Sequence, residues 1–179
     1  MIERELKLLL THYEYRYLLQ LFERRCDKRV IQTNYYYDTK TQAVRKANTT
    51  VRIREKNGRL KGTVKTHLKT DHCSRETSFQ VDAIPRVMML DTVPVWLMGS
   101  LKTERMIYHV SEGITLMLDQ NQYLETVDFE LEIEYSITHQ KQAEGILLLI
   151  GKLLEKDVCI ASTSKSERFF KRLEEKDKQ

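Results

Sequence analysis

The sequence is poor in the residues that hold small extracellular folds or membrane spans together. Its 179 residues include three cysteines, Cys26, Cys73 and Cys159, which are widely spaced and form no CxxC pair. Neither a disulfide framework nor a zinc knuckle is therefore expected. The longest purely apolar run, 146–150, is far shorter than the ~20 residues of a membrane-spanning helix. The first residues alternate acid and base and cannot form the apolar core of a signal peptide, so we expect a cytoplasmic protein with no membrane partner.

Proline and glycine, the residues typical of linkers, are also scarce. There are two prolines and six glycines, no low-complexity segment and no internal repeat, so nothing marks a domain boundary. With 41% hydrophobic residues, a chain of this length buries roughly two-thirds of its unfolded surface and needs no cross-links. We predict a single domain over residues 1–176, followed by a solvated C-terminal tail at 177–179.

Charge of one sign does not gather in blocks. The formal net charge is +4 at pH 7, but 30 basic residues are interleaved with 26 acidic ones. This distribution argues against a nucleic-acid partner. It favours a small anion, or an anion together with a metal ion.

What the sequence does contain is a series of alternating segments joined by short turns. Period-two alternation and β-favouring residues predict strands at 2–9, 32–37, 50–56, 60–66, 76–81, 102–110, 114–119 and 127–135. Helices are predicted at 12–25, 85–98, 138–156 and 164–176, the first and last opened by capping-box pairs. Asn57-Gly58 predicts a tight hairpin between two strands. Short connections favour an antiparallel sheet, so the predicted class is α+β.

The polar faces of the terminal strands are acidic. In the first strand Glu3, Glu5 and Lys7 share one face, opposite an apolar one. In the last strand the shared polar face consists of Asp128, Glu130, Glu132 and Glu134. Neighbouring carboxylates in such a row repel one another, and cations bound against the row would offset this repulsion.

The middle strands carry the opposite charge. Arg52 and Arg54 share one face, as do Lys61 and Lys65, and Arg105 lies within a later strand. Such a sheet could hold a divalent metal on its acidic side and a multiply charged anion on its basic side. Carboxylate oxygens suit Mg²⁺ or Mn²⁺. A solvated charged surface is the alternative, and the pattern by itself does not separate the two.

The order of these motifs resembles the CYTH superfamily, also called the triphosphate tunnel metalloenzymes. Glu3-x-Glu5-x-Lys7 is similar to the ExExK signature of that family. The further matches are, in chain order, Tyr37-Asp38-Thr39 with YxDT, Val51-Arg52-Ile53-Arg54 with LRIR, Val64-Lys65 with the basic hairpin strand, Arg75-Glu76 with the acidic strand after it, Arg105 with the later arginine strand, Leu118-Asp119 with LxLD, Glu130-x-Glu132-x-Glu134 with ExE, and Ser164-Lys165-Ser166-Glu167-Arg168 with the SKSER helix start.

The resemblance implies a fold and a set of roles. The fold would be a closed eight-stranded antiparallel barrel, with its polar face inward and helices packed on the outside. The implied ligands of Mg²⁺ or Mn²⁺ are Glu3, Glu5, Glu130 and Glu132. The implied triphosphate-binding residues are Lys7, Arg52, Arg54, Lys65, Arg105, Lys165 and Arg168. Glu5, Lys7 and Glu76 would take part in catalysis, although Ser78 stands where many members have a second acid.

Several activities are compatible with the resemblance. The first is metal-dependent hydrolysis of inorganic tripolyphosphate or of a small organic triphosphate such as thiamine triphosphate. The others are cyclisation of ATP to cyclic AMP, as in class IV adenylate cyclases, and non-catalytic binding of polyphosphate or a nucleotide. The expected partner is a small-molecule triphosphate, and the expected state is a monomer or homodimer.

Overall fold

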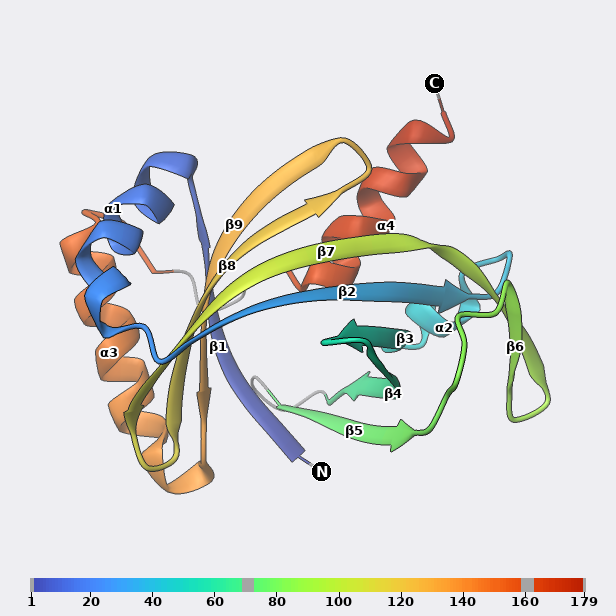
Figure 1. The fold of residues 1–179 in the computed structure, drawn as a ribbon, viewed down its shortest axis with the longest axis horizontal. Coiled ribbons are helices and arrows are strands. Elements are labelled where there is room, and N and C mark those ends of the chain that lie inside the picture. The colour runs from blue at the N-terminus through green and yellow to red at the C-terminus, as the bar shows by residue number, and fades with distance from the viewer. Residues whose placement is uncertain (1, 69–72, 159–162, 179) are drawn as a thin grey trace.

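The computed structural model describes residues 2–68, 73–158 and 163–178 (Figure 1). Its strands are β1 Ile2–Leu10, β2 Lys28–Asp38, β3 Thr49–Lys56, β4 Arg59–His67, β5 Cys73–Phe79, β6 Val87–Leu90, β7 Val93–Ser111, β8 Ile114–Tyr123 and β9 Thr126–Tyr135. Its α-helices are α1 His12–Phe22, α2 Ala43–Lys46, α3 Gln140–Leu153 and α4 Lys165–Lys176, with short 3₁₀ turns at Glu23–Arg25 and Ile137–His139.

Eight of the strands close into a barrel. The sheet runs β2-β3-β4-β5-β1-β9-β8-β7, and β7 pairs back onto β2 to complete the ring. Every pairing in this ring is antiparallel. The predicted α+β class and the eight-stranded antiparallel barrel are confirmed. Closure places the acidic strands β1 and β9 side by side although they come from opposite ends of the chain.

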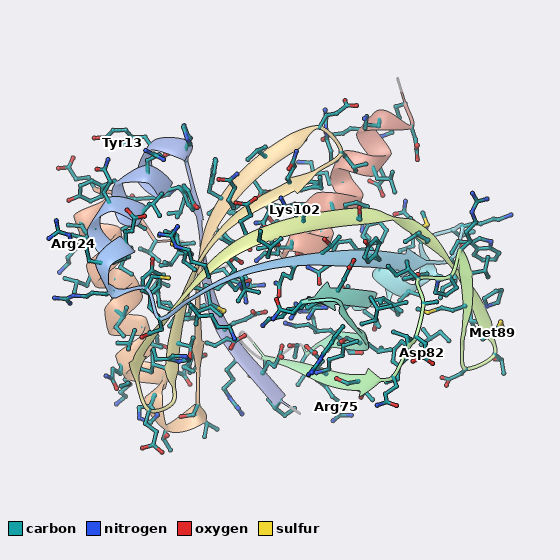
Figure 2. The ribbon with its side chains drawn as sticks, viewed as in Figure 1. Tyr13, Arg24, Arg75, Asp82, Met89 and Lys102 are labelled. Carbon is teal, nitrogen blue, oxygen red and sulfur yellow. The ribbon has the colours of Figure 1, made fainter. Side chains whose placement is uncertain are left out.

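Two helices cover the apolar outer face of the barrel. Helices α1 and α3 lie together on one side of the barrel, next to β1 (Figure 1). Leu6, Leu8 and Leu10 of β1 are buried in a cluster with residues of both helices. Tyr15 and Leu18 of α1 are buried in this cluster. Tyr13 of α1 and Arg24 of the 3₁₀ turn that follows it point away from the barrel (Figure 2). Among the described residues, no helix is long and apolar enough to cross a membrane.

Helix α1 begins where the sequence indicates. The Glu14 amide donates to Thr11 Oγ1 at 3.2 Å, and the Thr11 amide donates to Glu14 Oε2 at 2.6 Å. This capping box satisfies two amides that the helix itself leaves without partners. The equivalent box at Ser164 and Glu167 opens α4.

The helix predicted over 85–98 is wrong. This segment forms β6 and the beginning of β7, joined by a turn at Asp91 and Thr92. Met88 and Leu90 are half-buried while Val87 and Met89 are exposed, which is the alternation of a strand. The hairpin covers the outer face of β2 and β3, where it packs with Tyr37, Val51, Ile53 and Val95. This tertiary apolar surface overrides the helix preference of methionine and leucine.

The remaining strand predictions are confirmed, with shifted ends. β2 begins at Lys28 and β8 continues to Tyr123, because these ends pair with β7 and β9 respectively. Asn57 and Gly58 have φ angles of 52° and 71°, as a two-residue hairpin turn requires. β3 and β4 are therefore held in tight register, with Lys65 opposite Thr50 and Arg54 opposite Lys61.

Candidate active site

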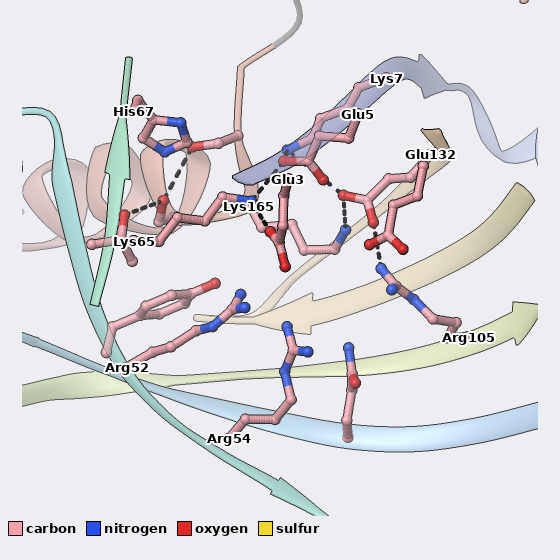
Figure 3. Close-up of a pocket in the computed structure, with 16 residues that line it drawn as sticks. Glu3, Glu5, Lys7, Arg52, Arg54, Lys65, His67, Arg105, Glu132 and Lys165 are labelled. Atoms are coloured by element: carbon pink, nitrogen blue, oxygen red, sulfur yellow. Dashed lines mark hydrogen bonds and ion pairs between the residues drawn. The ribbon is translucent and has the colours of Figure 1, made fainter. Parts of the chain in front are cut away.

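A charged cavity occupies the barrel interior. The predicted site residues that line it are Glu3, Glu5, Lys7, Arg52, Arg54, Lys65, Arg105, Glu132 and Lys165 (Figure 3). They come from β1, β3, β4, β7, β9 and the first turn of α4. Arg52 and Arg54 lie on one side of the cavity, across from Glu3, Glu5 and Glu132 on the other (Figure 3). The barrel thus brings together charges that are far apart in the sequence.

The basic wall is built on β2 and β3. Arg54 Nε donates a hydrogen bond to Asn34 Oδ1 at 3.0 Å. Arg52 Nη2 lies 3.7 Å from Glu76 Oε2. Burial, and then the charges of Arg52 and Arg105, lower the pKa of Arg54 to about 10. The wall is therefore rich in positive charge and only weakly neutralised by acids.

Two donors in this wall have no acceptor. Arg52 Nε and Asn34 Nδ2 are buried and make no hydrogen bond within the part of the chain that the structure describes. A buried donor without a partner costs about 1–3 kcal/mol, and such groups are rare in native proteins. Arg52 lines the cavity, so oxygens of an anion there would satisfy its Nε, and Asn34 lies directly behind the wall, hydrogen-bonded to Arg54.

On the opposite side, lysines hold the acids of β1. Lys65 Nζ lies 3.0 Å from Glu3 Oε2 and 2.8 Å from Glu5 Oε1. Lys7 Nζ lies 3.0 Å from Glu5 Oε1 and 3.7 Å from Glu132 Oε1. Burial alone would raise the pKa of Glu5, but the charges of Lys7 and Lys65 outweigh it and hold that pKa well below its ordinary range. Glu5 is therefore an anion inside the barrel.

A cluster of three buried carboxylates lies beside these residues, on β8 and β9. Asp119, Glu130 and Glu132 each offer an oxygen within 4.8 Å of the others. Arg105 grips Asp119 with two hydrogen bonds, from Nε at 2.8 Å and from Nη2 at 2.6 Å. Burial would raise the pKa of Asp119, but the charges of Arg105 and Lys165 lower it to about 2. Three clustered carboxylates form a donor set that fits Mg²⁺ or Mn²⁺.

Lys165 directs its ammonium group into this carboxylate cluster. Its Nζ lies 2.8 Å from Asp119 Oδ2 and 2.9 Å from Glu132 Oε1, and it also contacts Glu130. Lys165 is the first residue of α4, and the neighbouring Ser164 and Ser166 line the cavity too. The N-terminus of α4, with its free amides and positive dipole, thus faces the interior.

Three of the predicted site residues lie outside the cavity lining. Arg168 binds Asp128 Oδ2 through Nε at 2.8 Å and Glu130 Oε2 through Nη2 at 2.9 Å. Glu130 belongs to the carboxylate cluster, and Glu76 lies beside Arg52. Arg168 consequently fixes the position of the Glu130 side chain. The role predicted for Arg168 in substrate binding remains a prediction.

Three residues in or beside the cavity have no role predicted from the sequence. Asp119 belongs to the carboxylate cluster, Asn34 accepts a hydrogen bond from Arg54, and Thr50 lines the cavity. Strand alternation could have found the last two, because Asn34 lies two residues from Tyr36 and Thr50 two residues from Arg52, and both of those line the cavity. Thr50 Oγ1 lies 3.0 Å from Ser166 Oγ and so connects β3 to α4.

The closed barrel sets a basic wall across from buried carboxylates, an arrangement whose charges complement a polyanion accompanied by a cation. The chain belongs to the CYTH domain family, whose model matches residues 1–169. The resemblance found in the motifs is therefore confirmed.

Individual relatives agree with this assignment. A Bacillus subtilis protein named "Putative triphosphatase YjbK" is 31% identical over 156 residues, which make up 78% of this chain and 80% of the relative. A Bacillus halodurans structure, described as a putative adenylate cyclase, has a TM-score of 0.75 and 22% identity over 94% of this chain and 97% of that one. HpAC1 from Hippeastrum, described as a putative adenylyl cyclase with a dominant triphosphatase activity, has a TM-score of 0.73 and 19% identity over 95% of both chains. At these identities the two structures establish a shared fold.

Proposed function

We propose that this protein is a divalent-metal-dependent triphosphatase that hydrolyses tripolyphosphate, or a small organic triphosphate, inside its barrel. The observation that carries the proposal is a pair of buried donors, Arg52 Nε and Asn34 Nδ2, that lack acceptors among the described residues, across from the clustered carboxylates. A multiply charged oxyanion matches both sides at once, if a cation accompanies it. Membership of the CYTH family and the name of the Bacillus subtilis relative support the same activity.

The basic wall would bind and orient the substrate. The guanidinium groups of Arg52 and Arg54 can each donate to two phosphate oxygens. Lys7 and Lys65 bring point charges from the opposite side. A chain of phosphates held at several oxygens is positioned for attack of water on its terminal phosphoryl group, and the same cations stabilise the charge on the departing phosphate.

The carboxylates would hold the metal ion. Asp119, Glu130 and Glu132 fit this role by chemistry and spacing, and Glu3 and Glu5 are the further ligands that the family resemblance implies. When bound, Mg²⁺ or Mn²⁺ supplies a Lewis acid that withdraws charge from phosphoryl oxygens. Glu76, with Ser78 in place of a second acid, is proposed to position the attacking water or to join a second metal site.

The test is a substrate panel. Phosphate release is measured from tripolyphosphate, ATP and thiamine triphosphate with Mg²⁺ or Mn²⁺, beside detection of cyclic AMP. The proteins are the wild type, Glu5→Ala and the matched control Glu112→Ala, whose side chain is exposed in a turn outside the cavity. We expect metal-dependent hydrolysis that Glu5→Ala abolishes and Glu112→Ala retains. Formation of cyclic AMP as the main product, or tight binding without turnover, would overturn the proposal.

A further inference from the structure

A second basic surface lies where the β3–β4 hairpin ends. An open depression there is lined by Arg54, Lys56, Asn57, Arg59, Leu60, Lys61, Ser78, Phe79 and Gln80. Four of these residues are cations and none is an acid. We call Arg54, Lys56, Arg59 and Lys61 the basic track.

The register of the hairpin forces like charges together. Lys56 is directly opposite Arg59, and Arg54 is directly opposite Lys61. Like charges directly opposite on neighbouring strands destabilise a sheet. Within the described residues none of the four forms an ion pair, whereas Lys7, Lys65, Arg105 and Lys165 inside the barrel all do. The repulsion among these four cations indicates that the surface binds an anion.

The basic track is continuous with the barrel cavity. Arg54 lines both the cavity and the depression. Arg52, Arg54 and Lys56 follow one face of β3, with neighbouring cations about 7 Å apart. Burial, and then the charges of Lys28 and Arg54, lower the pKa of Lys56. An anion bound in the cavity therefore has an uninterrupted row of cations leading outward.

The charge of the basic track indicates which chemical group it would bind next to an anion in the cavity. Leu60 and Phe79 supply its apolar side chains, but a neutral organic group resting on them would leave four positive charges uncompensated. Each further phosphate of a linear chain brings negative charge and oxygens that accept from lysine and arginine. We propose that the basic track binds the outer phosphates of a linear polyphosphate longer than three units while the end of that chain occupies the barrel. This inference rests on the proposed function, whose substrate class it makes more specific.

The test is binding of tripolyphosphate and of a longer, size-fractionated polyphosphate, measured by titration calorimetry in EDTA so that hydrolysis does not interfere. The track variant carries Lys56→Gln, Arg59→Gln and Lys61→Gln. The control variant carries Lys141→Gln, Lys152→Gln and Lys171→Gln, which remove the same charge from exposed positions on α3 and α4. The track variant should lose about tenfold or more of its affinity for the longer chain, and under about threefold for tripolyphosphate. The control variant should bind both as the wild type does.

A second measurement distinguishes a loss of binding from a loss of folding. Removing like charges from the hairpin should raise the thermal unfolding midpoint of the track variant at low salt, relative to the control variant. The inference is overturned if the wild type does not bind the longer chain, or if the track variant keeps its affinity for it. It is also overturned if the affinity of the track variant for tripolyphosphate falls by the same factor as its affinity for the longer chain. Phosphate release from tripolyphosphate by the wild type is measured separately, so that failure of the triphosphatase proposal is recognised independently.

Discussion

At the scale of single residues, hydrogen bonding in the basic wall is incomplete. Arg54 donates to Asn34 Oδ1, but the amide nitrogen of Asn34 and the Nε of Arg52 lack acceptors among the described residues. Lysine in place of Arg52 would keep the charge and lose the planar fork. The site therefore depends on the shape of the guanidinium as well as on its charge.

Arg52→Lys should consequently weaken triphosphate binding. We expect KM for tripolyphosphate to rise about tenfold, the equivalent of one lost charge-assisted hydrogen bond, with a smaller change in kcat. Steady-state kinetics of phosphate release measure both constants. Arg24→Lys, on the outer surface (Figure 2), is the control and should behave as the wild type. An unchanged KM in Arg52→Lys would show that the guanidinium does not contact substrate.

His67 gives the barrel a predictable response to acid. Burial, and then the charges of Lys65 and Lys7, lower the pKa of His67 below its ordinary value of 6.5. The unfolded chain therefore takes up a proton at higher pH than the folded one, and stability falls as pH decreases from 6.5 through the lowered pKa.

The wild type should accordingly lose more unfolding free energy than His67→Gln between about pH 7.5 and about pH 5. Urea unfolding at the two pH values measures this difference. His109→Gln, which changes an exposed imidazole, should keep the acid sensitivity of the wild type. Equal losses in wild type and His67→Gln would refute this assignment.

At the scale of elements, the bulge of β7 allows helix α4 to pack closely against the barrel. Gly99 has a φ of 149°, and the register between β2 and β7 shifts beside it. A Cβ at Gly99 would lie 2.8 Å from Phe169 Cζ of α4. Phe169 is fully buried against Tyr36 of the barrel, so it cannot move away freely.

Gly99→Ala should therefore destabilise the protein by about 1–3 kcal/mol, through backbone strain and overpacking. Gly145→Ala is the matched control, because a Cβ there meets nothing within 4 Å on the exposed side of α3. That change should stabilise the protein by up to about 1 kcal/mol. Urea unfolding of both variants distinguishes these signs, and a neutral Gly99→Ala would argue against tight seating of α4.

The elements also show what sequence can and cannot predict. Strands such as β1 and β9 were predicted because their alternation is complete, and α1 because Thr11 and Glu14 mark its start. The β6–β7 hairpin was missed because its apolar partners lie on β2 and β3, far away in the sequence. Asp38, which matches a family motif, accepts hydrogen bonds from the backbone amides of Val44 and Arg45 and so caps α2. No local sequence pattern reveals this role.

At the scale of the whole molecule, closure of the barrel creates the site. Strand alternation predicts which face of each strand is charged, but only the ring order places β9 beside β1 and β8, and β3 across from them. The reach of Lys165 into the carboxylates of Asp119 and Glu132 depends on how α4 packs. The predicted residues were therefore largely brought together, while their actual partners could not be predicted without the three-dimensional structure.

The measurement that tests the account most directly is phosphate release from tripolyphosphate as a function of added Mg²⁺ or Mn²⁺. It compares the wild type with Glu132→Gln, which keeps the shape of one cluster side chain, and with Glu112→Gln at an exposed turn. Release should be absent in EDTA, rise with metal, and fall about 100-fold or more in Glu132→Gln at the same metal concentration. Glu112→Gln should match the wild type. Release that persists in EDTA, or a correctly folded Glu132→Gln that is fully active, would contradict the account.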